Sequence, residues 1–532
     1  MFMKKRNRIL AGILAVMLTF SLAGCGGQDA AGSTAGTVGT AEDASQVQEE
    51  NNGTAANTDG ITIAVSSDIT TLDPQNASGT VTATVFFNMF DCLTRMDAEG
   101  NVECLLAESY ENLDDTTWQF KLRQGVTFTN GEIFNADTVK YSVERILDEN
   151  YGSSVMADFA DIDSVEVVDD YTVNIITKTP FPSLPLRLTY LAMVPKDYIT
   201  ENGDDYFAAN PVGTGAYKLE SYEEGNQLVL TANEDYFMGA PEVKKVTFKI
   251  IKEESTRVMA VQAGEVDIAM SIPVSQIGAI DATDGYSIIA GPADRTMFLG
   301  MNTIGNEALS KKEVRQAICY AIDMDTIISV ILGGYADKTA ALSLPQWSGY
   351  DASVTPYEYD PEKAKQMLAD AGYASGLSLE IAVVNGEYPC FSEIAEAIAG
   401  QLQSVGIDAY VNYYEKSVLR GAVKDNSIPA LYLMGLGGPY AENNQTLRII
   451  CGTGERYSTW SNEEFDTLRA EAGSEFDETK RNELWSQIQS LIKEEAPVAS
   501  LYQLYGVYAV RDNLDWTPAL NEVIQVNEIS YK

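Results

Sequence analysis

Strand-like and helix-like patterns alternate along the chain from Ile61 onward, and this alternation constrains the fold more than any other feature. Residues 379–383 alternate as in a half-buried strand, residues 391–405 carry a helical pattern, and residues 407–411 alternate again. This order predicts two parallel strands joined by a right-handed helical crossover. Interleaved elements of this kind predict an α/β fold.

Local signals place individual elements. Trp118, Phe120 and Leu122 alternate as the buried face of a strand, and Asn135 is a suitable N-cap for the helical pattern that follows it. The run Ser310-Lys311-Lys312-Glu313 has the spacing of a capping box, in which each of the two end side chains accepts a hydrogen bond from the backbone of the other. We therefore predict a helix that is capped by Ser310.

The first 25 residues are typical of an exported, lipid-anchored protein. Four basic residues lie between Lys4 and Arg8, and residues 9–22 carry no charge. This run is shorter than the roughly 20 residues of a permanent membrane helix, which favours an export signal. It ends in Leu22-Ala23-Gly24-Cys25, which resembles the bacterial lipobox. We predict a signal peptide at 1–24 and an acylated Cys25 on the extracytoplasmic face of the cell membrane; an ordinary secretory signal is the alternative.

A second N-terminal segment, residues 25–59, has no aliphatic periodicity and is rich in Gly, Ala, Ser, Thr, Asn and Gln. Such a segment cannot bury enough apolar surface to offset the entropy of ordering it, so we predict a flexible tether. The chain from residue 60 onward is long enough for two or more domains.

The composition limits the function. A formal charge of −41 disfavours nucleic acid and anionic lipid as partners. The absence of histidine excludes a Ser-His-Asp triad, an HExxH zinc site and a histidine general base. A carboxylate pair among 77 acidic residues is uninformative, so a secreted hydrolase is kept only as an alternative. The cysteines form no CxxC pair, which argues against a zinc site; Cys92 and Cys104 flank a turn-like stretch and are either two free thiols or a pair.

A series of motifs runs through the chain. The stretch Trp118-Gln119-Phe120-Lys121-Leu122-Arg123-Gln124-Gly125-Val126-Thr127-Phe128 is followed by Asn130-Gly131 and Asn135-Ala136-Asp137. The others are Leu72-Asp73-Pro74, Pro211-Val212-Gly213-Thr214-Gly215-Ala216-Tyr217, Asn233-Glu234-Asp235-Tyr236-Phe237, Gln262-Ala263-Gly264-Glu265-Val266-Asp267, Val314-Arg315-Gln316-Ala317, Asp370-Ala371-Gly372-Tyr373 and Phe465-Asp466-Thr467-Leu468. In this order they resemble the peptide/nickel-type solute-binding proteins of ABC importers, family 5.

The resemblance implies a fold of two α/β lobes that close on a ligand about a hinge, with an extra domain inserted in the first lobe. The implied boundaries are 60–89, 210–294 and 499–532 for lobe one, 90–209 for the inserted domain, and 295–498 for lobe two. The implied function is not enzymatic and needs no cofactor: the protein captures a small peptide or peptide-like solute and delivers it to an ABC permease and its ATPase.

The resemblance also implies where the ligand lies. Residues carried over from the family to the wall between the lobes are Ser78, Gly79, Thr80, Met270, Ser271, Thr296, Phe298 and Tyr502. Hydroxyl groups and backbone amides suit a site that accepts a peptide without reading its sequence.

One departure from the family concerns the stretch Met434 to Tyr440. Peptide-binding members commonly have an aromatic residue and then an aspartate here, and the aspartate pairs with the ligand's α-amine; this chain has Leu436 and Pro439 instead. Because a buried ammonium without a carboxylate is costly, this argues against recognition of a free N-terminus, unless Glu442 replaces the aspartate.

The same stretch leaves a second ligand class open. Gly437, Gly438, Pro439 and Tyr440 resemble the nickel-type branch, in which aromatic residues pack against a metal chelate. Without a protein histidine, the metal would arrive inside a metallophore, held by groups such as Tyr440 and Arg187. Peptide-like ligands are the first expectation, a nickel or metallophore chelate the alternative, and glycans or opines remain open; a sensor in place of a permease is a further alternative.

Overall fold

The computed structural model describes residues 60–97, 100–437 and 442–532. Strands and helices alternate through this part of the chain, which confirms the predicted α/β class. The predicted signal peptide, the tether and Cys25 lie outside the described residues, as do Gly438, Pro439 and Tyr440. No helix in the described ranges combines the length and the apolar character needed to cross a membrane.

Eleven strands form the largest sheet. Their bounds are β1 (Ile61–Val65), β8 (Tyr217–Glu223), β9 (Gln227–Ala232), β10 (Lys245–Ile250), β11 (Ile268–Ala269), β12 (Tyr286–Met301), β13 (Ala336–Lys338), β14 (Leu377–Val384), β15 (Ile407–Tyr414), β16 (Leu431–Gly437) and β17 (Val498–Arg511). Their order is β15-β14-β16-β12-β17-β11-β1-β10-β9-β8, and β13 pairs with β17. We call β8, β9, β10, β1 and β11 the first half of the sheet, and β16, β14 and β15 the second half.

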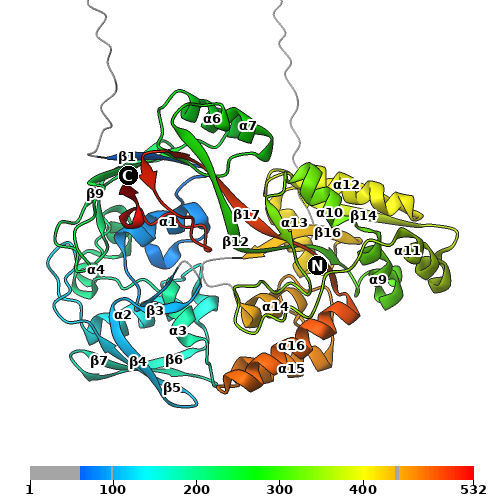
Figure 1. Cartoon of the computed structure of the whole chain (residues 1–532). Helices are drawn as coiled ribbons and strands as arrows, with labels where there is room; N and C mark the ends of the chain where they lie inside the picture. Colours follow the sequence, from blue (N-terminus) through cyan, green and yellow to red (C-terminus); the bar gives the residue numbers. More distant parts are fainter. Residues whose placement is uncertain (1–59, 98–99, 438–441) are drawn as a thin grey trace, which may run out of the picture. The chain divides into compact units, whose positions relative to one another are not determined.

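The long strands β12 and β17 join the two halves. They pair antiparallel from Tyr286 opposite Arg511 to Gly300 opposite Val498. Figure 1 shows the two long strands, β12 in green and β17 in red, close to each other. Along this length β17 also pairs with β11, and β12 pairs with β16. The register of the pair shifts after Pro292, so the regular ladder is interrupted where the sheet passes from one half to the other.

Three smaller sheets lie outside this sheet. One has the order β4-β5-β7-β6, and the others pair β2 with β3 and β18 with β19. The bounds of these strands are β2 (Thr94–Met96), β3 (Val102–Cys104), β4 (Ala107–Asp114), β5 (Thr117–Leu122), β6 (Ile162–Asp169), β7 (Thr172–Thr177), β18 (Leu514–Asp515) and β19 (Ser530–Tyr531). The predicted strand is β5, and its alternating Trp118, Phe120 and Leu122 are all buried.

Helices connect most of the strands. Their bounds are α1 (Thr80–Met89), α2 (Ala136–Leu147), α3 (Leu184–Arg187), α4 (Lys196–Asn202), α5 (Asp204–Ala209), α6 (Glu254–Gln262), α7 (Ile277–Asp281), α8 (Glu307–Ser310), α9 (Lys312–Ala321), α10 (Met324–Thr326), α11 (Pro361–Leu368), α12 (Phe391–Ser404), α13 (Lys416–Lys424), α14 (Asn443–Cys451), α15 (Glu463–Ser474) and α16 (Glu478–Glu495). The predicted crossover is β14-α12-β15, with its two strands parallel.

Of the two helix caps predicted from the sequence, one is confirmed and one is wrong. The side chain of Asn135 accepts a hydrogen bond from the Thr138 amide, and the Thr138 hydroxyl accepts one from the Asn135 amide, so α2 has a capping box. The capping box predicted at Ser310 is wrong, because Ser310 ends the short helix α8 and its hydroxyl donates to the Glu307 carbonyl at 2.7 Å. The next helix, α9, has Lys311 as its N-cap and no side-chain cap.

Buried side chains pack on both faces of the sheet. In β1, Ile61, Ile63 and Val65 join one apolar cluster, whereas Ala64 joins another on the opposite face. In β12, Met297 and Phe298 likewise belong to different clusters. Alternation of this kind is expected when helices cover both faces. The domain boundaries implied by the resemblance remain a prediction.

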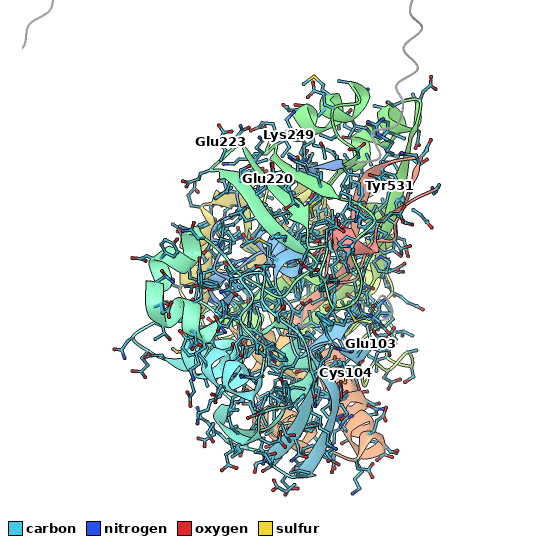
Figure 2. The ribbon with its side chains drawn as sticks, turned by 90° about the vertical axis from the view of Figure 1, so that its left-hand side faces the viewer. Glu103, Cys104, Glu220, Glu223, Lys249 and Tyr531 are labelled. Carbon is cyan, nitrogen blue, oxygen red and sulfur yellow. The ribbon has the colours of Figure 1, made fainter. Side chains whose placement is uncertain are left out.

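The outer rim of the first half of the sheet is charged. Figure 2 shows Glu220 and Glu223 on the edge strand β8 and Lys249 on β10. Lys245 of β10 also forms an ion pair with Glu220 of β8 at 2.7 Å. Charged side chains on an edge strand oppose pairing with a strand of another molecule. Cys104, also labelled in Figure 2, is a free thiol.

The other member of the suspected pair, Cys92, is buried and is likewise a free thiol. Burial raises the pKa of the Cys92 thiol well above its ordinary value. Of the two alternatives left open by the sequence, the structure therefore has two free thiols.

Candidate functional site

A cavity of about 430 Å³ lies where loops from both halves of the sheet meet. We call it the central cavity. It is bordered by residues from the segments 66–67, 79–81, 252–257, 270–274, 332–335, 386–389 and 504–508, and by Arg295, Lys416 and Glu522. Its volume falls within the range of about 300–1,000 Å³ that small-molecule sites occupy.

The sheet topology explains why loops from distant parts of the chain meet here. In the first half, β1 is parallel to β10 and β11, and the segments after these three strands supply Ser66, Lys252 and Met270. In the second half, β14 is parallel to β15, and the segments after these strands supply Tyr388 and Lys416. Ligands of open α/β sheets bind outside the carboxyl ends of the strands, and both halves present such ends to the central cavity.

Arg257 fixes the loops of the first half. This residue of α6 is buried, and its guanidinium donates to four backbone carbonyls, those of Ile251, Lys252, Met270 and Ser271, at 2.7–3.1 Å. Burial lowers the pKa of Arg257. Since its hydrogen bonds go to the backbone, Arg257 acts as a clamp on the loop ends and has few donors left for a ligand.

Three ion pairs bring charge to the rim, one in the first half of the sheet and two in the second. Lys252 pairs with Asp68 at 2.6 Å on the side of the first half. On the side of the second half, the nearly buried carboxylate of Glu387 pairs with Lys416 at 3.1 Å and with Arg420 at 2.7 Å. The Glu387 charge is thus balanced by two cations.

A fourth ion pair lies deeper. Arg295 of β12 contacts Glu522 at 2.9 Å and Tyr388 at 3.2 Å, and its guanidinium lies 5.2 Å from the centre of the Tyr388 ring. The Tyr388 hydroxyl in turn donates to the Gly435 carbonyl at 3.2 Å. Burial acts to lower the pKa of Arg295, but the negative charge of Glu522 and the hydrogen bonds to Glu522 and Tyr388 outweigh it, and the pKa rises above its ordinary value. Arg295 is therefore a fixed cation at the boundary between the halves.

Four of the residues predicted from the family resemblance border the central cavity: Gly79, Thr80, Met270 and Ser271. Ser78 is exposed and directly precedes Gly79, but it does not border the cavity. Ser271 has a positive φ of 53°, and its hydroxyl lies 3.4 Å from that of Ser66.

Three other predicted residues lie inside the packed sheet. Thr296 and Phe298 of β12 and Tyr502 of β17 are completely buried. The hydroxyl groups of Thr296 and Tyr502 have no hydrogen-bond partner among the described residues. Leu436 and Gly437 end β16 opposite Thr296 and Arg295. None of these five predicted residues borders the central cavity, and their roles stay predictions.

Arg187 and Glu442 contact each other instead of the cavity. The Glu442 carboxylate accepts a hydrogen bond from Ser183 at 2.7 Å and lies 3.6 Å from Arg187. Burial raises the pKa of Glu442, although Arg187 and Ser183 lower it. Glu442, which was considered from the sequence as a replacement for the family's aspartate, therefore already contacts Arg187 of α3 and Ser183, the N-cap of that helix.

The sequence reasoning missed Arg295, Tyr388 and Glu522. A signal existed for Tyr388, because Asn385-Gly386 is a turn signal between the predicted strand at 379–383 and the predicted helix at 391–405. The loop at the carboxyl end of a parallel strand is where a ligand contact is expected. Glu522 carries no such signal, since it lies in an irregular stretch that follows the last long strand.

Sequence comparisons find similar proteins. The profile of the bacterial extracellular solute-binding proteins, family 5 (middle), matches residues 101–458. The glutathione-binding protein GsiB of Pectobacterium atrosepticum is 28% identical over 476 residues, which cover 85% of this chain and 92% of that protein.

Solved structures share the fold. The ABC transporter substrate-binding protein CtaP of Listeria monocytogenes superposes with a TM-score of 0.81 at 25% identity, over 89% of this chain and 99% of that one. HbpA2 of Haemophilus parasuis superposes with a TM-score of 0.79 at 23% identity, over 89% of this chain and 100% of that one.

Proposed function

Because this chain belongs to the family 5 bacterial extracellular solute-binding proteins, we propose that it captures a small peptide or peptide-like solute in the central cavity and delivers it to the permease and ATPase of an ABC importer. The observation that carries the proposal is the position of the cavity at the carboxyl ends of parallel strands from both halves of the sheet. A ligand held there contacts both halves, and such contacts favour a closed arrangement of two lobes.

The charges around the cavity support a zwitterionic ligand with a small negative net charge. Four basic side chains (Lys252, Arg257, Arg295, Lys416) and three acidic ones (Glu254, Glu387, Glu522) border it. The chain as a whole carries −41. A locally basic cavity in a strongly acidic protein favours carboxylates over ammonium groups alone. Peptides meet this requirement, and the name of the relative GsiB makes glutathione the first peptide to test.

Ligand binding without chemistry is the direct test of the proposal. We expect native mass spectrometry of freshly purified protein to show one bound solute per chain, and calorimetry to show saturable binding of glutathione or another short peptide. The ligand should be recovered with unchanged mass, because a carrier releases what it binds. Tight binding of a nickel–histidine complex with no binding of any peptide would replace this proposal by the chelate alternative, and cleavage of the ligand would replace it by the hydrolase alternative.

Anchoring to the membrane is a separate part of the proposal and rests on Leu22-Ala23-Gly24-Cys25. We expect intact-mass analysis of the mature protein to show the loss of residues 1–24 and the added mass of acyl chains on Cys25. Several buried acyl chains hold a protein at a membrane because each methylene contributes about 0.8 kcal/mol.

A cysteine substitution tests the anchor by fractionation. Cys25→Ser should abolish the added mass and the cleavage that depends on it. Cys104→Ser removes a thiol of the folded part and serves as the control, with the membrane fraction unchanged. A wild-type protein with an unmodified thiol at Cys25 would contradict the prediction.

A further inference from the structure

Arg295 and Glu522 form an ion pair that faces the central cavity. Nε and Nη2 of Arg295 donate to Oε2 of Glu522 at 3.2 and 2.9 Å, and Nη1 donates to the Tyr388 hydroxyl at 3.2 Å. The two charged side chains are 14% and 19% exposed, so both are largely shielded from bulk water but still border the cavity. Charge-assisted hydrogen bonds in such surroundings are strong and directional.

The pair has hydrogen-bonding capacity that the described residues do not use. A guanidinium has five N–H donors, and three of those of Arg295 donate to described residues. Both hydrogen bonds on Glu522 end on Oε2, and Oε1 accepts none from the described part of the chain. N–H donors of the positively charged Arg295 and the Oε1 acceptor of the negatively charged Glu522 therefore lie next to each other at the cavity wall.

Other charged groups at the cavity differ in this respect. Arg257 donates to backbone carbonyls, and Glu387 is balanced by two cations. Lys252 is exposed and pairs with Asp68, which lies outside the cavity wall. Of the ion pairs described at the cavity, that of Arg295 and Glu522 is thus the one best suited to exchange its mutual contact for contacts with a ligand.

The backbone at both residues is irregular. Glu522 has a φ of 61°, a left-handed conformation that residues with a side chain rarely adopt, and its amide donates to the Ala519 carbonyl at 3.0 Å. Arg295 lies where the register between β12 and β17 shifts. Strained residues of this kind collect at ligand sites, where the surrounding structure holds them in place. The turn from Ala519 thus aims the Glu522 carboxylate at the point where the two halves of the sheet meet.

We propose that Arg295 and Glu522 together bind an α-amino-acid head group, with the ligand carboxylate on Arg295 and the ligand ammonium on Glu522, and that the central cavity therefore prefers γ-glutamyl peptides to α-linked peptides. This inference rests on the proposed function, because it names the class of peptide that the cavity takes. It assigns to Glu522 the role of the missing aspartate near Pro439.

The preference follows from the spacing of charges in the ligand. In a γ-glutamyl peptide such as glutathione, the free ammonium and the free carboxylate of the first residue sit on the same carbon. In the α-linked isomer, the free carboxylate of that residue is two methylene groups further from the ammonium. Arg295 and Glu522 lie within hydrogen-bonding distance of each other, so the compact head group matches their separation better.

Three ligands of related structure test the inference on the wild-type protein. Calorimetry with glutathione, its α-linked isomer Glu-Cys-Gly and N-acetylglutathione should give at least a ten-fold weaker binding for the second and third. The isomer has the same atoms and charges as glutathione, so only the spacing differs. If the wild-type protein binds both isomers equally, or binds peptides but not glutathione, the inference is overturned while the proposed function stands. Binding of no peptide at all would overturn the proposed function.

A substitution identifies the residue that binds the ammonium. Glu522→Gln keeps the shape of the side chain and should weaken glutathione binding at least ten-fold, while N-acetylation of the ligand should then cause little further loss. Glu265→Gln is the matched control, because Glu265 is an exposed carboxylate that pairs with Lys249 outside the cavity; it should leave affinity and the acetylation effect unchanged. A full acetylation penalty in a folded Glu522→Gln protein would overturn the assignment, and the ligand comparison on the wild type decides the case if the variant fails to fold.

Discussion

Replacing Arg145 by methionine is expected to lower the free energy of unfolding by about 3–5 kcal/mol, because it leaves a buried carboxylate without its cation. Arg145 and Asp73 have side chains only 4% and 3% exposed, and they pair at 2.6 Å. The guanidinium also pairs with Asp204 at 2.7 Å and lies 3.9 Å from the centre of the Tyr151 ring. Methionine fills similar space but supplies neither charge nor donors.

The same helix supplies a control for this prediction. Lys140 and Glu144 of α2 form an exposed pair at 3.6 Å, and Lys140→Met should change stability by less than about 1 kcal/mol. Urea unfolding of the two variants beside the wild type, followed by circular dichroism, measures both effects. Equal losses for Arg145→Met and Lys140→Met would mean that the buried network adds no more than a surface pair.

The Arg145 network also shows what family motifs encode. Leu72-Asp73-Pro74 resembles a family motif, yet in the structure Asp73 caps a short helical turn and holds Arg145. Gly213 and Gly215 behave in the same way, because a Cβ at either position would lie within 2.0–2.4 Å of the backbone of Met89. These residues serve packing, not ligand binding, since none of them borders the central cavity.

Local patterns predicted the elements whose buried side chains all lie on one face. The crossover at 379–411 and the strand at 118–122 follow from periodicity alone, since their buried side chains repeat with the period of the element. The cap predicted at Ser310 failed because two short helices meet there, and a four-residue motif cannot distinguish a helix start from a helix end.

The site was predicted less completely than the fold. Gly79, Thr80, Met270 and Ser271 border the central cavity and were carried over from the family. Glu522 was not, because its position at the cavity depends on the path of an irregular segment that lies 227 residues from Arg295 in the sequence. A contact of this range leaves no local pattern in the sequence.

The carboxyl group of Asp294 is expected to make the stability of the protein depend on pH. Asp294 precedes Arg295 in β12 and is 4% exposed; it accepts a hydrogen bond from Trp347, and its amide donates to the Leu520 carbonyl at 2.6 Å. Burial raises the pKa of Asp294 from 3.8 to about 8, and the charge of Glu522 adds to this; the Trp347 hydrogen bond and the charge of Arg295 oppose it.

The sign of the effect follows from proton binding. Between the pKa of the unfolded chain and that of the folded protein, the folded protein binds the proton at Asp294 and the unfolded chain does not. Stability contributed by this group is therefore present at low pH and is lost as the pH rises, by up to about 1.4 kcal/mol per pH unit. An asparagine side chain at this position would keep an acceptor for Trp347 without a titrating proton.

The comparison of wild type with Asp294→Asn isolates this group, because all other titrating residues are shared. From about pH 5 to about pH 8, the stability of Asp294→Asn relative to the wild type should increase steadily, by several kcal/mol in total. Urea unfolding at a series of pH values measures the difference, and Asp515→Asn controls for the loss of an exposed carboxylate on β18. Parallel curves for the wild type and Asp294→Asn would show that the carboxyl group ionises in the folded protein as it does in the unfolded chain. A rising difference would instead show that Asp294 is protonated and uncharged in the folded protein. An uncharged Asp294 does not compete with Glu522 or with the ligand for the positive charge of Arg295.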